Sequence, residues 1–335
     1  MNFNKILIRG PDTIGSFVLA TPFYRELRKN FPYSYIVLCV KPLVYELSKN
    51  CKYVNNVLLY SCKSLKERLL FLKLLKKEKF ESVFLLSGSF ESALMSYLSG
   101  IKIRIGYPHD RRGFLLTHKI KDIKNIHYVD YILNILKNIN GIIENKNPEI
   151  YINNEDSENI LTKFLKSNLL SEKIIGLNLT AIGEKARTWP KEYSIDLIKK
   201  LLEKNFIIFL FGTNKDIKYS EYINSKIDNN KLINLIGKTN IKEFIVLLKK
   251  CDIFVSVATG GIHIANALNK KIIGLYCPGD EIGWGPYNKK NVEVITKYVN
   301  CSPCNQHKMK HCKNNICMKL ISPEEVFEKI IYLLN

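Results

Sequence analysis

One stretch near the carboxyl end of the chain, residues 251–287, restricts the fold most strongly. Residues 253–257 are a short apolar, β-branched run of the kind that forms a buried parallel strand. The glycine pair Gly260–Gly261 follows, then helical spacing, then a second buried-strand pattern over residues 272–276. Strand, glycine turn, helix and strand make half of a doubly wound sheet, which binds ligands at such turns. Because a helix N-terminus favours anions, the stretch predicts a nucleotide-diphosphate site, unless the glycines only make a tight turn.

The net charge and the hydropathy of the chain limit the classes of protein to which it can belong. The chain has 335 residues, of which 46% are hydrophobic, and no apolar run long enough to cross a bilayer. The amino terminus enters a strand without a signal-peptide pattern, so we expect a soluble, cytoplasmic protein. A formal net charge of +20 indicates either a solvated basic surface or an anionic partner. No nucleic-acid-binding module is recognisable, which leaves a membrane surface or an acidic glycolipid as the better partner.

The same strand and turn pattern opens the chain and recurs along it. Residues 6–8 predict a strand, and helical spacing over residues 17–30 follows, with Pro22 expected to kink or restart the helix. An asparagine-rich, polar stretch at residues 141–173 indicates a link between two domains, together with one helix. We therefore predict an α/β protein with two Rossmann-like, doubly wound domains facing across a cleft, at residues 1–153 and 154–335. Further strands are expected at residues 35–40, 82–86, 174–179, 206–211 and 231–235.

Both halves of the chain contain short motifs that belong to one recognisable pattern. These residues are Arg9, Gly10, Ile14, Gly15, Thr21 and Pro22 near the start, Trp189 and Pro190, Gly237, Lys238 and Thr239, Thr259, Gly260 and His263, and Gly285, Pro286 and Tyr287. The pattern resembles that of glycosyltransferase family 9, the bacterial lipopolysaccharide heptosyltransferases. Three positions depart from the family pattern: Ala258 and Gly261 replace an aspartate and a proline, and Ser16 replaces the catalytic aspartate.

The resemblance implies the fold called GT-B, with an acceptor-binding amino-terminal domain and a nucleotide-sugar-binding carboxyl-terminal domain. It also implies an inverting transfer of a heptose, without a metal cofactor, from a nucleotide-diphosphate sugar such as ADP-heptose. The acceptor would be the lipopolysaccharide inner core or a similar surface glycan, reached by peripheral contact with the inner membrane. Two alternatives stay open, an impaired protein that binds nucleotide sugar or glycan without transfer, and an enzyme for a different sugar.

The resemblance also assigns the donor site. The family's phosphate-binding lysine falls on Arg187, with Lys185 as a nearby substitute, while Asn214 or Asp216 would touch the ribose or base. The full set of expected donor-binding residues is Gly15, Lys185, Arg187, Asn214, Asp216, Thr239, Ala258, Thr259, Gly260, Gly261 and His263.

The catalytic base has to come from another residue, because the Ser16 hydroxyl is too weak a base. Asp12 lies on the same glycine turn and is the preferred replacement, although such a residue often only bonds its own turn. Asp110 is the other candidate. Its neighbours Arg111 and Arg112 suit an anionic acceptor, or else belong to a solvated loop.

Two further segments of the sequence each allow two interpretations. Cys301, Cys304, Cys312 and Cys317 lie in the cysteine-rich segment 301–317 and have a spacing that suits a structural zinc or iron site, or are separate reduced thiols. Residues 65–79 form a leucine- and lysine-rich helix that either covers the sheet, the preferred reading, or lies on a membrane.

Overall fold

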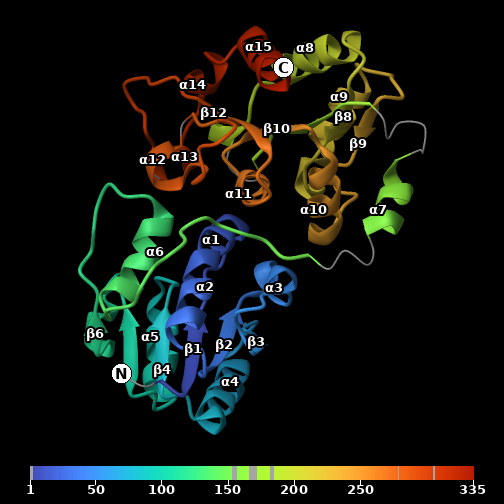
Figure 1. Ribbon diagram of the computed structural model, residues 1–335. Coiled ribbons are helices and arrows are strands. Elements are labelled where there is room, and N and C mark those ends of the chain that lie inside the picture. Colours follow the sequence, from blue (N-terminus) through green and yellow to red (C-terminus); the bar gives the residue numbers. More distant parts are fainter. Residues whose placement is uncertain (1–2, 153–156, 166–171, 182–184, 278, 305) are drawn as a thin grey trace. The chain divides into compact units, whose positions relative to one another are not determined.

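The chain folds into two compact units, residues 1–151 and 152–335. The computed structural model describes residues 3–152, 157–165, 172–181, 185–277, 279–304 and 306–335, without the side chains of Lys185 and Gln306. Figure 1 shows that helices flank a central sheet in each unit. The described part of the chain holds no helix that is both long and apolar enough to span a bilayer.

Unit 1 is a six-stranded parallel sheet with helices on both faces. The strand order is β3-β2-β1-β4-β5-β6. One face packs its apolar residues, among them Val37, Val83 and Leu85, against α4 and α5, while α1, α2 and α6 contact one another. The elements are β1 Lys5–Arg9, α1 Ile14–Leu19, α2 Thr21–Asn30, β2 Tyr35–Val40, α3 Pro42–Ser48, β3 Asn56–Leu59, α4 Leu65–Glu78, β4 Ser82–Leu85, α5 Phe90–Leu98, β5 Ile103–Gly106, η1 Arg112–Leu115, β6 His118–Lys119 and α6 Tyr128–Lys137.

Unit 2 repeats this plan. Its sheet has the order β12-β11-β10-β7-β8-β9, which is the order of unit 1 with the corresponding strands renumbered. The elements are α7 Ser157–Phe164, β7 Ile174–Asn178, η3 Lys185–Arg187, α8 Lys191–Glu203, β8 Ile207–Leu210, η4 Asn214–Asp216, α9 Ile217–Asn224, β9 Leu232–Asn234, α10 Ile241–Lys250, β10 Ile253–Val257, α11 Gly260–Ala267, β11 Lys271–Leu275, α12 Glu281–Trp284, β12 Val292–Ile295, α13 Gln306–Lys310, α14 Ile316–Lys319 and α15 Pro323–Leu334. Both orders are those of Rossmann sheets, so the predicted fold class is confirmed.

Short sequence signals set several helix boundaries. The break expected at Pro22 is confirmed, since α1 ends at Leu19 and α2 starts with proline in its first turn. α4 begins with a capping box, in which Ser64 and Glu67 each accept a backbone hydrogen bond from the other. Ser322 caps α15 by accepting from the Glu325 backbone.

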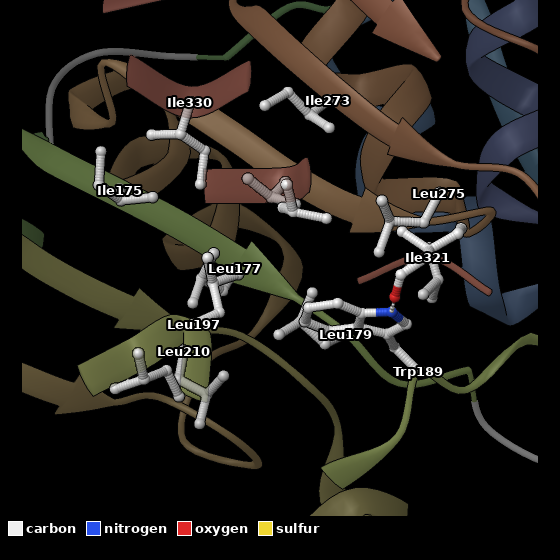
Figure 2. Close-up of a cluster of buried hydrophobic side chains, with 14 of the residues drawn as sticks. Ile175, Leu177, Leu179, Trp189, Leu197, Leu210, Ile273, Leu275, Ile321 and Ile330 are labelled. Atoms are coloured by element: carbon white, nitrogen blue, oxygen red, sulfur yellow. Dashed lines mark hydrogen bonds between the residues drawn. The ribbon is translucent and has the colours of Figure 1, made fainter. Parts of the chain in front are cut away.

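A single tryptophan organises much of the unit 2 core. Trp189 is fully buried just before α8, packed among leucine and isoleucine side chains from the sheet and from α8. Its indole Nε1 donates a hydrogen bond to the Ile321 carbonyl oxygen at 3.0 Å, drawn as a dashed line in Figure 2. The bond ties the segment before α15 to the start of α8, so this residue holds two distant stretches of unit 2 together.

Candidate active site

Each sheet contains one topological switch point, which is a pair of neighbouring strands whose following connections run to opposite sides of the pair. In unit 2 this switch point lies between β7 and β10, because β8 and β9 continue on one side and β11 and β12 on the other. The loops after such a pair diverge and leave a crevice, which is where open α/β sheets bind ligands. A hydrogen bond spans it, from Asn178 Nδ2 at the end of β7 to Thr259 Oγ1 beyond β10, at 3.3 Å.

The amino-terminal turn of α11 opens at this crevice. Its N-cap residue, Thr259, makes no side-chain capping bond, and the first turn has no acidic residue. The turn packs closely at Gly261, since a Cβ there would lie 3.2 Å from Phe244 Cζ and 3.5 Å from Asn178 Nδ2. Backbone N–H groups at a helix start, together with the helix dipole, favour an anion such as a diphosphate.

A cation lies beside this turn. Arg187 Nη1 donates to the carbonyl oxygen of Ala258 at 3.2 Å, and its Nε donates to Met309 Sδ at 3.3 Å. The guanidinium is therefore brought to the end of β10, and its predicted contact with a donor phosphate stays a prediction. His263 is buried one turn further along α11, so its contact with a donor stays a prediction. The side chain of Lys185 lies outside the described part of the chain.

The remaining donor candidates follow β8 and β9 at the same edge of the sheet. Asp216 is buried and accepts hydrogen bonds from the backbone and hydroxyl of Thr213, so it caps a turn and does not fit the predicted ribose contact. Asn214 is exposed, and its Oδ1 would lie 2.7 Å from a Cβ at Gly237, whose φ of +71° favours glycine. The contacts predicted for Asn214 and Thr239 stay predictions.

The switch point of unit 1 lies between β1 and β4 and carries Asp12. Arg9 Nη2 lies 2.6 Å from Asp12 Oδ1, and Lys41 Nζ lies 2.7 Å from Asp12 Oδ2. Burial acts to raise the pKa of Asp12, but the charges of Arg9 and Lys41 outweigh it and lower the pKa. Asp12 is therefore a positioned, ionised carboxylate at the carboxyl end of β1.

Ser16 and Asp110 are engaged in helix starts. Ser16 is buried in the first turn of α1, next to Gly15, and its hydroxyl donates to the Thr13 carbonyl oxygen at 3.1 Å. Asp110 Oδ2 accepts a hydrogen bond from the Phe90 backbone N–H at 2.7 Å, at the start of α5. Both side chains thus have a local structural role, and Asp12 is the better placed of the candidate catalytic residues.

The two adjacent arginines lie in opposite environments. Arg111 is exposed, so it stays a candidate for binding an anionic acceptor. Arg112 is 1% exposed, and burial lowers its pKa to about 10. Its guanidinium donates to four main-chain oxygens and to a hydroxyl, which leaves it unavailable to a ligand. The predicted acceptor contact of Arg112 is therefore wrong, and the residue ties the loop to the sheet. Its acceptors are Tyr107 O, Ser87 O, Ser89 O, Leu85 O and Ser92 Oγ.

Unit 1 also has a small cavity that the sequence did not suggest. It measures about 20 Å³, enough for one water-sized group, and lies between the sheet, α4 and α5. Its wall is mixed, with the apolar Leu7, Phe71 and Leu75 beside the polar or charged Arg9, Tyr60, Ser89 and Glu91. Burial, followed by Glu91, raises the pKa of Tyr60. Among these residues, only Arg9 was singled out by the sequence, as part of the family resemblance.

The cysteine-rich segment does not form a ready metal site. Among the described residues, no three His, Cys, Asp or Glu side chains gather closely enough to hold a metal ion. Cys304 donates instead to the Cys301 carbonyl oxygen at 3.2 Å. Burial, followed by Cys301, raises the pKa of Cys304, and Cys312 and Cys317 add to this effect. The binding of zinc or iron by the four cysteines stays a prediction.

Comparisons with known proteins agree with the two-sheet GT-B fold. A lipopolysaccharide heptosyltransferase 2 of Escherichia coli (strain K12) is 24% identical over 317 residues, which cover 88% of this chain and 89% of that protein. The solved E. coli ADP-heptose lps heptosyltransferase II gives a TM-score of 0.82 at 22% identity over 98% of both chains. An E. coli heptosyltransferase solved with ADP-2-deoxy-2-fluoro heptose gives 0.72 at 18% identity, over 98% of this chain and 99% of that one. The model of glycosyltransferase family 9 (heptosyltransferase) matches residues 68–314, more than half of the sequence, and the chain therefore belongs to this family.

Proposed function

We propose that this glycosyltransferase moves a heptose from ADP-heptose to the inner core of lipopolysaccharide or a similar surface glycan, with inversion at the anomeric carbon. The observation that carries the proposal is the position of Arg187 beside the uncapped start of α11 at the unit 2 switch point. A helix start and a guanidinium together suit a nucleotide diphosphate. The names of two solved relatives include ADP-heptose or its fluorinated analogue, which supports this choice of donor.

In the proposed reaction, an acceptor hydroxyl attacks the anomeric carbon while the bond from that carbon to the diphosphate oxygen breaks. The bonding electrons leave with ADP, whose new negative charge is stabilised by the N–H groups at Gly260 and Gly261 and by Arg187. The proton of the attacking hydroxyl passes to a carboxylate. The proposed reaction needs no metal ion.

Unit 1 is the proposed acceptor-binding unit, and Asp12 is the proposed base. A base must be ionised before it can accept the proton, and the neighbouring Arg9 and Lys41 keep Asp12 in that state. The cavity beside Arg9 suits a hydroxyl group of the acceptor, because Arg9, Tyr60 and Ser89 bring hydrogen-bonding atoms to its wall. Arg111 is an exposed cation available to the acidic groups of such a glycan.

A second candidate function is binding of a nucleotide sugar without transfer. The same ion pairs favour it, since both carboxylate oxygens of Asp12 already contact cations and the Ser16 hydroxyl is used within α1. The two functions share the donor site and differ only in turnover.

Calorimetry and a transfer assay separate these possibilities. We expect ADP to bind the wild-type protein and Arg187→Ala to weaken binding roughly 10- to 100-fold, since a hydrogen bond to a charged group contributes about 1.5–3 kcal/mol. Gly260→Asp should also weaken binding by repelling the diphosphate. Lys199→Ala removes the same charge from an exposed position on α8 and should leave the affinity unchanged.

Heptose transfer from ADP-heptose to a heptose-deficient core acceptor is then measured with the wild-type protein. Transfer supports the enzyme, whereas ADP binding without turnover supports the binding protein. Unchanged ADP affinity in both Arg187→Ala and Gly260→Asp would contradict the assigned donor site under either function.

A further inference from the structure

Helix α4 presents an unusually apolar outer surface. Its inward side packs Phe71 and Leu75 into the unit 1 core, as expected for a helix that covers a sheet. Four other leucines are exposed, with exposed fractions between 38% and 71%. Isolated exposed leucines are common, but several on one helix mark an interaction surface. These residues are Leu65, Leu69, Leu70 and Leu74.

The same outer surface is strongly basic. Lys66, Lys73, Lys76 and Lys77 are all exposed, and no ion pair involving them is found among the described residues. The acids of α4 are used elsewhere, because Glu67 belongs to the capping box and Glu78 pairs with Lys5 at 2.7 Å. The charge of the lysines is therefore not neutralised within the helix.

The spacing places the two kinds of side chain together. Positions 66, 73 and 77 are seven and four residues apart, which lines up three lysines on one face of the helix. The leucine pairs at 65 and 69 and at 70 and 74 are each four residues apart and flank that row on either side. The outer face of α4 is thus a row of lysines between two leucine edges.

We propose that this face docks unit 1 onto an anionic lipid bilayer. Leucines suit the boundary between headgroups and acyl chains, while lysines reach lipid phosphates with their long side chains. A second copy of the chain fits less well, because the rows of lysines would face each other and repel. The net charge of +20 adds a general attraction to an anionic surface.

Helix α4 also borders the small cavity of unit 1. Phe71 and Leu75 line the cavity, and Arg68 Nε pairs with Glu91 Oε1 of its wall at 2.9 Å. A membrane-bound α4 therefore brings the proposed acceptor-binding unit to the surface in which a glycolipid lies. The bilayer contact itself is independent of which sugar is transferred, so it can be tested without a transfer assay.

Flotation of the full chain with lipid vesicles tests the proposal. Wild-type protein should bind vesicles that contain phosphatidylglycerol and phosphatidylethanolamine, and should bind phosphatidylcholine vesicles weakly. Each lysine near an anionic surface contributes roughly fivefold in partitioning, so a K66Q/K73Q/K77Q variant should bind about 100-fold more weakly. A matched variant, K199Q/K218Q/K226Q, removes three exposed lysines of unit 2 and should lose less.

A second variant separates the apolar contribution. L65S/L69S/L70S keeps every charge and should lose the part of the binding that persists at high salt, where the electrostatic attraction is screened. Circular dichroism melting confirms that each variant is folded. Absence of wild-type binding to anionic vesicles, or equal binding by both lysine variants, would overturn the proposal, as would a leucine-dependent dimer that does not bind vesicles.

Discussion

Arg111 and Arg112 provide a strict test of the structural reasoning, because they are adjacent and chemically identical. Arg111 is the N-cap of η1 and Arg112 its first residue, but only Arg112 is buried, with a hydrogen bond to Ser92 of α5. Replacing each by alanine removes the same charge and the same number of atoms. Any difference in stability between the two variants therefore reports the environment of the side chain.

The cost of Arg112→Ala follows from its hydrogen bonds. The carbonyl oxygens of Tyr107 and Ser87 each lose a charge-assisted bond, and a buried acceptor left unsatisfied costs about 1–3 kcal/mol. The unfavourable burial of the cation, seen in its lowered pKa, offsets part of this cost. We expect a loss of about 3 kcal/mol in the free energy of unfolding, against less than about 0.5 kcal/mol for exposed Arg111→Ala.

Urea denaturation followed by circular dichroism measures the difference. With a slope of about 1–3 kcal/mol per molar urea, the transition of Arg112→Ala should move down by about 1 M or more, whereas that of Arg111→Ala should not move. Arg112→Lys should recover little, because one ammonium cannot reach the acceptors that the forked guanidinium serves. Wild-type stability of Arg112→Ala combined with lost acceptor binding would refute the structural role and restore the prediction made from sequence.

Three further outcomes are expected. Asp12→Asn should abolish heptose transfer, while its ADP affinity measured by calorimetry stays at the wild-type value. Asp110→Asn should reduce transfer less. Full activity of Asp12→Asn would show that Asp12 is not the base. Lys41→Met deletes a charge that lowers the pKa of Asp12, so the acid limb of the pH profile of kcat/KM should move to higher pH, and an unmoved limb would contradict the ion pair's role. Trp189→Phe removes the indole donor to Ile321, and thermal melting should show a loss of about 1–3 kcal/mol, whereas an unchanged melting temperature would contradict its bridging role.

Most interior strands of the two sheets were predicted from sequence, whereas only one of the four edge strands, β9, was. Central strands such as β1 and β10 are buried on both faces, so their continuous β-branched runs are distinctive. The edge strands β3, β6 and β12 were missed, because exposed faces and polar residues break up their apolar runs. Edge strands are partly solvated, and their pairing depends on neighbours far along the chain.

The residues of the candidate site were also predicted only in part from the sequence. The turn at Thr259 and the approach of Arg187 were predicted from local patterns and from the family resemblance. Sequence could not show which of two adjacent arginines is buried, since that depends on how η1 packs against α5. No sequence pattern pointed to Tyr60, because its place in the cavity wall depends on the packing of the sheet, α4 and α5.

The shared strand order of the two sheets bears on how such chains diversify. Each switch point is built from one continuous half of the sequence, and each half has its own core. Mutations that alter one crevice can therefore accumulate without repacking the core of the other half. Ser16 belongs to the first half, whereas Ala258 and Gly261 belong to the second, so the departures from the family pattern lie in two separate cores. Under the proposed function, selection can change the choice of sugar donor and the choice of acceptor as independent traits.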